Sequence, residues 1–399
     1  MNKAIKRYSF FIFFLFMISM ELWIGWGGRK SLMLTLFACG ALFVKVMNKI
    51  PFIFSKRNII IVLLFYIAFL YRLGAGFEQV FTQIPSQLIP IICIVCVADN
   101  YKEKILGYIT KWYAYVMAFS LFIYLLVYTI HIPDFGSIEF AADSNYGTFT
   151  NYIFYVERIN KLTGSLPRFN GPFLEPGYVG MIGAFLIYAN KFNLKKKENK
   201  LILASVLATF SLSGWMLLLI GYILNIFYKG KIRMSHLVCF LLFIVVVVYG
   251  AKYYNDGNNI INEKIVSRLE YDKEKGFTGN NRNSQTIDLL ALGMWASDIN
   301  TILLGYNESF FYQFEERELV GSGFDKFLVH HGLLGVLLVI SFYIFIIRTA
   351  QDKKFACLFF VFVLFCFWQR SYALWLSWII CFYYSSVITD RSSILNRLK

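Results

Sequence analysis

Apolar runs of about 20 residues, each long enough to cross the hydrocarbon core of a bilayer as a helix, recur along most of the chain. Short polar stretches separate them. The pattern predicts spans at residues 8–26, 31–47, 58–73, 80–98, 106–130, 172–190, 200–228, 234–253, 325–347, 355–368 and 371–388. These runs indicate an all-α polytopic integral membrane protein.

The run at 200–228 is too long for one plain span and too short for two full ones. "FSLSG" at 210–214 interrupts it with two serines and a glycine. Basic stretches, "KFNLKKKENK" and "KGKIR", flank the run on both sides, and such stretches stay on the cytoplasmic side of a membrane. We therefore expect a hairpin of two short helices that enters and leaves on the same side.

Lys and Arg outnumber Asp and Glu by 39 to 24, which gives a net charge of +15, and they collect in the connections expected inside. This orientation signal predicts about twelve membrane segments, with both termini cytoplasmic. Orientation and attraction to anionic membrane lipids explain the excess of cations, so no nucleic-acid partner is expected. Hydrophobic residues make up 58% of the chain, above the roughly 45–50% of soluble proteins.

Two long polar segments, 131–171 and 254–324, fall on the external side in this topology. Loops of this length are usually functional or disordered. The second contains apolar residues at roughly helical spacing, so we expect a helix that lies on the membrane surface or against the bundle. Those residues are Ile287, Leu290, Ala291, Met294 and Ile299. Because no repeat or linker divides the chain, residues 1–399 are expected to form one integrated membrane domain.

The sequence has no P-loop, no GxSxG, no HExxH and no Cys/His cluster with metal-ligand spacing, so neither a metal nor a cofactor is expected. Arginines and carboxylates are the polar groups near the external membrane edge. The arginine fork binds phosphate through two parallel hydrogen bonds and keeps its charge, which suits an anionic lipid headgroup. These groups are Arg158, Arg168, Arg268, Arg282 and Arg317, with Glu175 and Asp325. Aromatic residues in the same loops would stack on sugars or form an interfacial belt.

Four motifs resemble, in their order and spacing, those of bacterial O-antigen and capsule repeat-unit polymerases. "RFNGPFLEPGYVG" at 168–180 resembles the Arg-Gly-Phe-Glu-Pro signature that opens a mid-chain helix in that family. "TFSLSGWMLLLIG" resembles the serine-rich broken helix that follows, and "NNRNSQTIDLLALGMWASDINTILLGYN" resembles an arginine-led outer helix. "SGFDKFLVHHGLLGVLLVI" is similar to the Ser/Asp segment before a Gly-Leu-Leu-Gly helix start. The resemblance covers roughly residues 160–345.

The resemblance implies a membrane glycosyltransferase that transfers a growing glycan from undecaprenyl pyrophosphate to the non-reducing end of a new lipid-linked repeat unit. It would act on the periplasmic face of the bacterial inner (plasma) membrane, with a chain-length regulator protein as a further partner. Arg168 and Glu175 would be catalytic: Arg168 grips the pyrophosphate, and Glu175 positions or deprotonates the acceptor hydroxyl. No metal is needed, because fixed cations stabilise the leaving group. The substrate-binding residues would be Arg158, Arg282, Asp325, His330, His331 and Arg370.

The chain departs from the wider superfamily at two points. Members often carry Ser-Arg at the broken helix, whereas this chain has Ser213-Gly214, so the role of that arginine is vacant or filled elsewhere. The related O-antigen ligases carry a His-Asn pair before Gly-x-x-Gly, but here the stretch reads "GSGFDKF" and His330 and His331 adjoin Gly332. This favours a polymerase over a ligase, which uses lipid A core as acceptor. A lipid-linked sugar flippase or transporter is another alternative, although transporters typically show repeat symmetry and mid-membrane polar groups.

Each candidate residue also has a purely structural explanation. Glu175 would serve only the dipole of the helix that it begins. Arg168 and Arg370 would be interface anchors that extend their charges towards water. Arg282 would be a solvated loop residue, Asp325 a helix cap, and the two histidines packing residues.

Overall fold

The computed structural model describes residues 2–26, 28–73, 81–139, 147–158, 168–230, 242, 245, 248–259, 261–272, 276–277, 285–306, 308–311, 313–314 and 323–387. This part of the chain is predominantly helical, as predicted. Four of its helices are long and apolar enough to cross a membrane: α2 (Lys30–Met47), α6 (Asp99–Ile130), α9 (Leu212–Lys229) and α14 (Gly323–Thr349). Together with shorter apolar helices, they indicate association with a membrane.

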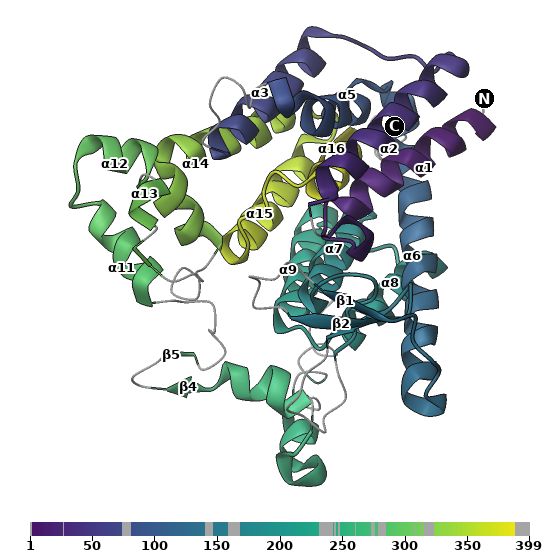
Figure 1. Ribbon diagram of the computed structural model, residues 1–399, viewed down its shortest axis with the longest axis vertical. Helices are drawn as coiled ribbons and strands as arrows, with labels where there is room; N and C mark the ends of the chain where they lie inside the picture. The colour runs from purple at the N-terminus through teal and green to yellow at the C-terminus, as the bar shows by residue number, and fades with distance from the viewer. Residues whose placement is uncertain are drawn as a thin grey trace. The chain divides into compact units, whose positions relative to one another are not determined.

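The chain divides into two compact units, residues 1–112 with 282–399 and residues 113–281, between which α6 is shared (Figure 1). The first unit also contains α1 (Asn2–Ile18), η1 (Trp23–Gly25), α3 (Lys56–Arg72), η2 (Ile84–Leu88), α5 (Ile89–Cys96), α11 (Gln285–Met294), α12 (Ile299–Leu304), α13 (Glu308–Phe311), α15 (Lys353–Gln369) and α16 (Leu376–Val387). The second contains α7 (Pro176–Ala189), α8 (Lys197–Ala208), η3 (Tyr254–Gly257), η4 (Asn262–Val266), η5 (Ser267–Leu269) and the strands β1 (Ser137–Glu139), β2 (Thr148–Asn151), β3 (Val156–Arg158), β4 (Tyr271–Asp272) and β5 (Gly276–Phe277).

The core of the first unit forms around α16, which is buried along its whole length and packs against α1, α5 and α15. A helix that is apolar on every side belongs in the interior. Buried hydroxyl groups there find carbonyl partners: Tyr8 donates to the Cys93 carbonyl at 2.7 Å and Tyr384 to the Ile94 carbonyl at 3.1 Å. Such pairing is required where no water reaches, because an unsatisfied polar group is costly in an apolar medium.

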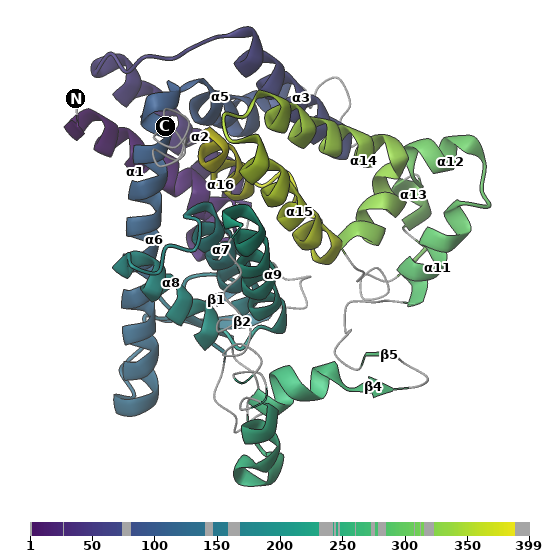
Figure 2. The ribbon, with the colours of Figure 1, turned by 180° about the vertical axis from the view of Figure 1, so that it is seen from behind.

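The core of the second unit forms around α7, which is buried over nearly all of its length between α8 and α9 (Figures 1 and 2). Gly180 of α7 meets Gly214 of α9 so closely that a Cβ on Gly214 would lie 2.8 Å from the Gly180 Cα. At the other end, Lys191 after α7 donates to the Tyr228 hydroxyl of α9 at 2.9 Å. The two helices therefore run in the same direction, with both N-termini at one end.

The expected break in the run at 200–228 is confirmed. The helix α8 ends at Ala208 and α9 begins at Leu212. The expected separation of the last two apolar runs at "WQRS" is also seen, since α15 ends at Gln369 and α16 begins at Leu376. The span expected at 234–253 lies mostly outside the described residues.

The segment 131–171, which was expected to be external, contains a small antiparallel sheet that the all-α prediction did not include. Its strand order is β1-β2-β3, and residues along β2 alternate between half-buried and buried. The alternation in "TFTN", with Phe149 inside, is the two-residue period of a half-buried strand. Long apolar runs do not reveal such a sheet, because strands of three or four residues are too short to form one.

Candidate functional site

The segment from Arg168 to Glu175 is an extended, mostly buried stretch that leads into α7 in the second unit. The Asn170 side-chain amide donates to the Phe173 carbonyl at 2.9 Å, which closes a tight turn. The Val156 amide donates to the Gly171 carbonyl at 3.0 Å and so ties this turn to β3. These two hydrogen bonds hold the segment that carries Arg168 and Glu175 against β3.

Glu175 is the residue before α7, with extended backbone angles, and Pro176 occupies the first helical position. The motif thus opens a helix, as in the family that it resembles, and proline is tolerated in the first turn of a helix. In the described part of the chain, the Glu175 side chain forms no capping hydrogen bond with its own helix. The half-buried carboxylate is therefore held at a helix N-terminus without being used as its cap.

Arg168 reaches the break between α8 and α9. Its Nε donates to the Thr209 carbonyl at 3.0 Å. Two residues further on, Ser211 caps α9 by accepting from the Gly214 amide, and its hydroxyl lies 3.0 Å from that of Ser213. The structure thus brings the arginine of one motif to Thr209, the first residue of another, a contact that the sequence did not predict.

Three helix termini meet at the end of the second unit that contains Arg168. The N-termini of α7 and α9, each with a partial positive charge, lie near the C-terminus of α8, whose C-cap carbonyl at Thr209 accepts from Arg168. The guanidinium adds a full charge. This arrangement suits a phosphate or pyrophosphate group.

Arg158 lies on β3, opposite Phe149 of β2, and is exposed. Val156, two residues before Arg158 on the same strand, donates to the Gly171 carbonyl. The strand that carries Arg158 therefore supports the segment that carries Arg168. Tyr155 on the same stretch is fully buried and stacks near Phe169 with ring centroids 6.3 Å apart. Of the two uses considered for aromatic residues in this loop, Tyr155 serves neither, because it packs in the core.

The first unit brings together Asp325 and Arg370 at the start of α14 and the end of α15. A Cβ on Gly323 would lie 2.2 Å from the Arg370 amide nitrogen, so the two segments touch. Arg370 Nη1 donates to the Tyr372 hydroxyl at 3.1 Å. Burial and then the charge of Asp325 raise the pKa of Asp288 on α11, a helix that packs against α14.

His330 and His331 lie in α14 just before a break at Gly332, where φ is +58°. The His330 ring stacks on Phe311 with centroids 4.0 Å apart, and within the described residues its buried Nε2 has no hydrogen-bond partner. The His331 carbonyl accepts from the Tyr71 hydroxyl of α3 at 3.2 Å. We call Asp288, Asp325, His330, His331 and Arg370 the Asp325 group. Arg282 lies outside the described residues.

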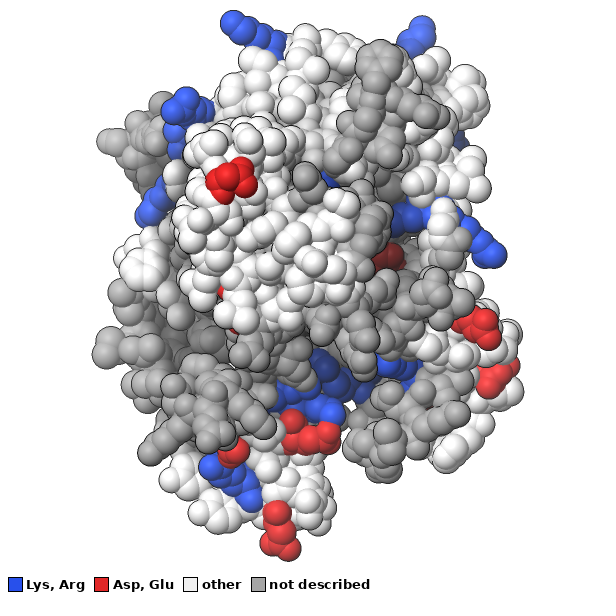
Figure 3. Space-filling view, turned by 60° about the vertical axis from the view of Figure 1, so that its left-hand side comes forward, with Lys and Arg blue, Asp and Glu red and all other residues white. Residues whose placement is uncertain are grey.

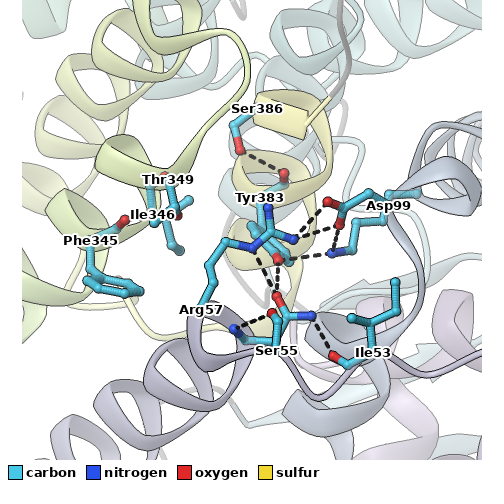
Figure 4. Close-up of polar contacts among 11 residues, drawn as sticks. Ile53, Ser55, Arg57, Asp99, Phe345, Ile346, Thr349, Tyr383 and Ser386 are labelled. Atoms are coloured by element: carbon cyan, nitrogen blue, oxygen red, sulfur yellow. Dashed lines mark hydrogen bonds and ion pairs between the residues drawn. The ribbon is translucent and has the colours of Figure 1, made fainter.

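A second cluster of charges in the first unit was not predicted from the sequence. Arg57 binds both oxygens of Asp99 at 2.8 and 2.9 Å, and the fully buried Lys102 binds the same carboxylate at 2.7 Å (Figure 4). Lys102 also donates to the Tyr383 hydroxyl at 2.9 Å, which donates to Asn58 at 3.0 Å. The spacing of "DNYK", with Asp and Lys three residues apart on a helix, was the available signal. We call these five residues the Arg57 cluster.

Comparisons of this chain with protein-family models, with curated proteins and with solved structures gave no match. Its function is therefore inferred from the geometry described above and from the four sequence motifs.

Proposed function

We propose that this chain is a membrane glycosyltransferase that polymerises undecaprenyl-pyrophosphate-linked repeat units of O-antigen or capsule. The observation that carries the proposal is the hydrogen bond from Arg168 to Thr209, because it joins two of the four motifs. In the superfamily that these motifs resemble, an arginine often follows the serine at the broken helix, whereas this chain has Gly214 at that position. Arg168 supplies a guanidinium at the same break from another segment.

In the proposed reaction, a hydroxyl oxygen of the acceptor sugar attacks the anomeric carbon of the growing glycan. The bond from that carbon to the pyrophosphate oxygen breaks, and the hydroxyl proton passes to Glu175. Undecaprenyl pyrophosphate leaves with the bonding electrons, and Arg168 with the N-termini of α7 and α9 stabilises its charge. Fixed cations take the role of a metal ion in this scheme, so the reaction is expected to be metal-independent.

The remaining candidates are proposed to bind the lipid-linked substrates. Arg158, Arg282 and Arg370 would contact phosphate or sugar hydroxyls, and Asp325 with His330 and His331 would contact the glycan. The grouping of Asp325 and Arg370 supports this role, because opposite ends of one substrate headgroup need both donors and acceptors.

We also propose about twelve spans in the bacterial inner membrane, with cytoplasmic termini and a periplasmic active face. Contacts within the first unit support the proposed alternation of successive connections between the cytoplasmic and periplasmic sides. The expected inner connections meet, since the Ile53 amide donates to the Cys96 carbonyl and the Asp352 amide to the Ser386 carbonyl. The expected outer ends meet as well, since Tyr71 contacts His331.

The test is polymer formation by purified variants supplied with lipid-linked repeat units. Glu175→Gln keeps size and polarity but cannot take the proton, so the rate should fall by roughly 10²–10⁴. Arg168→Ala should cost roughly 10²–10³, the value of one charge-stabilising contact. Arg168→Lys should be impaired less, because it keeps the charge and loses the fork.

Glu139→Gln is the matched control, because Glu139 is an exposed carboxylate on β1 of the same unit. It should polymerise normally. Near-normal polymer from well-folded Glu175→Gln would remove Glu175 from the catalytic role. If the wild type left single repeat units unextended but joined them to lipid A core, the protein would be a ligase, and transport without any new bond would indicate a flippase.

A further inference from the structure

The pair α11–α12 is apolar on two opposite sides. Ile287, Ala291 and Met294 of α11 are buried towards α14 and the small core that includes Phe311 and Val329. The opposite side carries six large apolar side chains that are between 42 and 70% exposed: Leu289, Leu292, Trp295, Ile299, Leu303 and Leu304. A helix that packs on one side normally carries polar residues on the other, and this pair does not.

The exposed side is fixed rigidly to α14, so it cannot turn inward. The Tyr306 amide after α12 donates to the Val329 carbonyl of α14 at 2.9 Å. The break at Gly332 lets the end of α12 approach closely, since a Cβ on Gly332 would lie 2.3 Å from the Leu303 carbonyl oxygen. The apolar surface therefore needs a covering that comes from outside this unit's own core.

The exposed residues of α12 continue onto α14. Leu303 and Leu304 lie beside Gly332, and Leu334 and Leu337 follow on the exposed side of α14. This helix has the highest mean hydropathy, 2.2, of the four membrane-span candidates in the described residues. Figure 3 shows a broad area with few charged side chains on the side where α11–α14 lie in Figure 1. Lipid acyl chains suit the exposed apolar side of α14, so they also suit the exposed apolar side of α11–α12 that continues from it.

The polar residues of the pair lie at the helix ends: Thr286 and Asp288 in the first turn of α11, and Asp298 and Asn300 at the turn between the helices. Asp298 caps α12 by accepting from the Asn300 and Thr301 amides at 2.8 and 3.1 Å, and both Asp298 and Asn300 are exposed. Trp295 stands beside this turn, and tryptophan prefers the level of the lipid headgroups. An apolar face with a polar edge and a tryptophan between them is typical of a helix embedded at a membrane surface.

We infer that the exposed face of α11–α12, formed by these six side chains, is embedded in the acyl-chain region of the bilayer, with the Asp298 turn at the headgroups. The segment is then a membrane-surface platform rather than a part of a solvated external loop. It would hold Asp288 at the depth of the lipid headgroups. The inference does not depend on the proposed reaction.

Spin labels on single cysteines test this in the full chain, reconstituted in phosphatidylethanolamine–phosphatidylglycerol vesicles. Cys39, Cys239 and Cys357 are first replaced by alanine, while Cys93, Cys96, Cys366 and Cys381 are kept because they are buried, and labelling of this background protein is measured as the blank. The label is then placed at Leu289→Cys, Leu292→Cys or, as the water-facing control, Asn300→Cys. Collision rates with oxygen, which concentrates in lipid, and with a water-soluble nickel chelate are measured. The oxygen-to-nickel ratio at Leu289 and Leu292 should exceed that at Asn300 several-fold.

Two outcomes would overturn the inference. A ratio at Leu292 equal to that at Asn300 would place the face in water. Low collision rates with both reagents, together with spin–spin broadening that grows with protein density, would show that a second copy of the chain covers the face. All labelled positions are exposed side chains, so loss of folding is not expected, and a monodisperse elution profile of each variant confirms this.

Discussion

The helix α3 joins two charged regions of the first unit that are built in different ways. Arg57 near its start belongs to the Arg57 cluster, where one carboxylate lies between two cations at 2.7–2.9 Å. Tyr71 near its end contacts His331 of the Asp325 group. There, burial and then the charge of Asp325 raise the pKa of Asp288. The carboxylate of the first region is held between cations, whereas the second region includes two carboxylates that disfavour each other's charge.

This difference indicates different roles. A buried cation that is matched by its own carboxylate stabilises the arrangement of helices and offers little to a ligand. Like charges held together by the fold raise the energy of the free protein, and such perturbed groups concentrate at functional sites. In the Asp325 group, close backbone contacts at Gly323 and Gly332 hold the segments of the group together. The contrast assigns structural support to the Arg57 cluster and agrees with the binding role proposed for the Asp325 group.

The largest effect is expected from Gly332→Ala. The glycine has φ +58° and ψ −171°, a conformation that costs other residues about 1–3 kcal/mol. The added Cβ would also collide with the Leu303 carbonyl. The variant should lose most of its monodisperse, detergent-solubilised protein in size-exclusion chromatography, and any remainder should melt well below the wild type.

Gly107→Ala is the matched control for that substitution. Gly107 is exposed on α6, and a Cβ added there would meet no heavy atom outside its own helix within 4 Å. Alanine favours a helix interior by roughly 0.5–1 kcal/mol over glycine, so this variant should be as stable as the wild type or slightly more stable. Equal melting temperatures for the two alanine variants would show that backbone contacts do not hold the Asp325 group.

The sequence predicted those features that depend on local pattern. The break at 210–214, the helix start after Glu175 and the helix through Ile287, Ala291 and Met294 follow from residues a few positions apart, and all are observed. Ile299 was included in the same helical spacing, but it is exposed, whereas the other three are buried, because the chain turns at Asp298 and begins a new helix. A helical periodicity that is continued across a turn no longer predicts which residues are buried.

Contacts between distant segments could not be predicted in this way. Lys102 and Tyr383 are 281 positions apart, and Arg168 and Thr209 are 41 apart, so no periodicity links them. The basic residues at the helix ends gave the orientation signal, and that signal contains no information on which carboxylate each cation meets. Only the packing of α3, α6 and α16 decides that Asp99 serves both Arg57 and Lys102.

An intermediate effect is expected from Asp99→Asn. It leaves the fully buried Lys102 without its carboxylate, and breaking a buried ion pair in this way costs up to about 3–5 kcal/mol. The cost should be smaller here, because the side chains of Arg57 and Asp99 are 24 and 29% exposed. Thermal unfolding in detergent should show a clear fall in melting temperature at neutral pH.

The companion variant Lys102→Met removes the buried cation and leaves the bidentate pair of Arg57 and Asp99 intact. Replacement of a buried charge by an apolar residue of similar size is often close to neutral. Lys102→Met should therefore melt above Asp99→Asn, and the double variant should recover part of the loss. If both single variants were as stable as the wild type, the cluster would not support the fold, and the contrast with the Asp325 group would fail.

The smallest effect is expected from Asp288→Asn. Burial and the neighbouring Asp325 raise the pKa of Asp288 above 3.8, so the folded protein holds this proton more tightly than the unfolded chain does. The resulting stability is present in acid and is lost as the pH rises from the ordinary pKa through the raised one. Asparagine stays neutral at every pH, so it should avoid that loss. The variant should match the wild type in acid and melt slightly higher at neutral pH, within about 0.5 kcal/mol, as for most partly exposed substitutions. Melting temperatures measured across the acid range for both proteins check this. A variant that melts lower than the wild type at neutral pH would show that Asp288 has a favourable cationic partner there, and the Asp325 group would then be complementary in the same way as the Arg57 cluster.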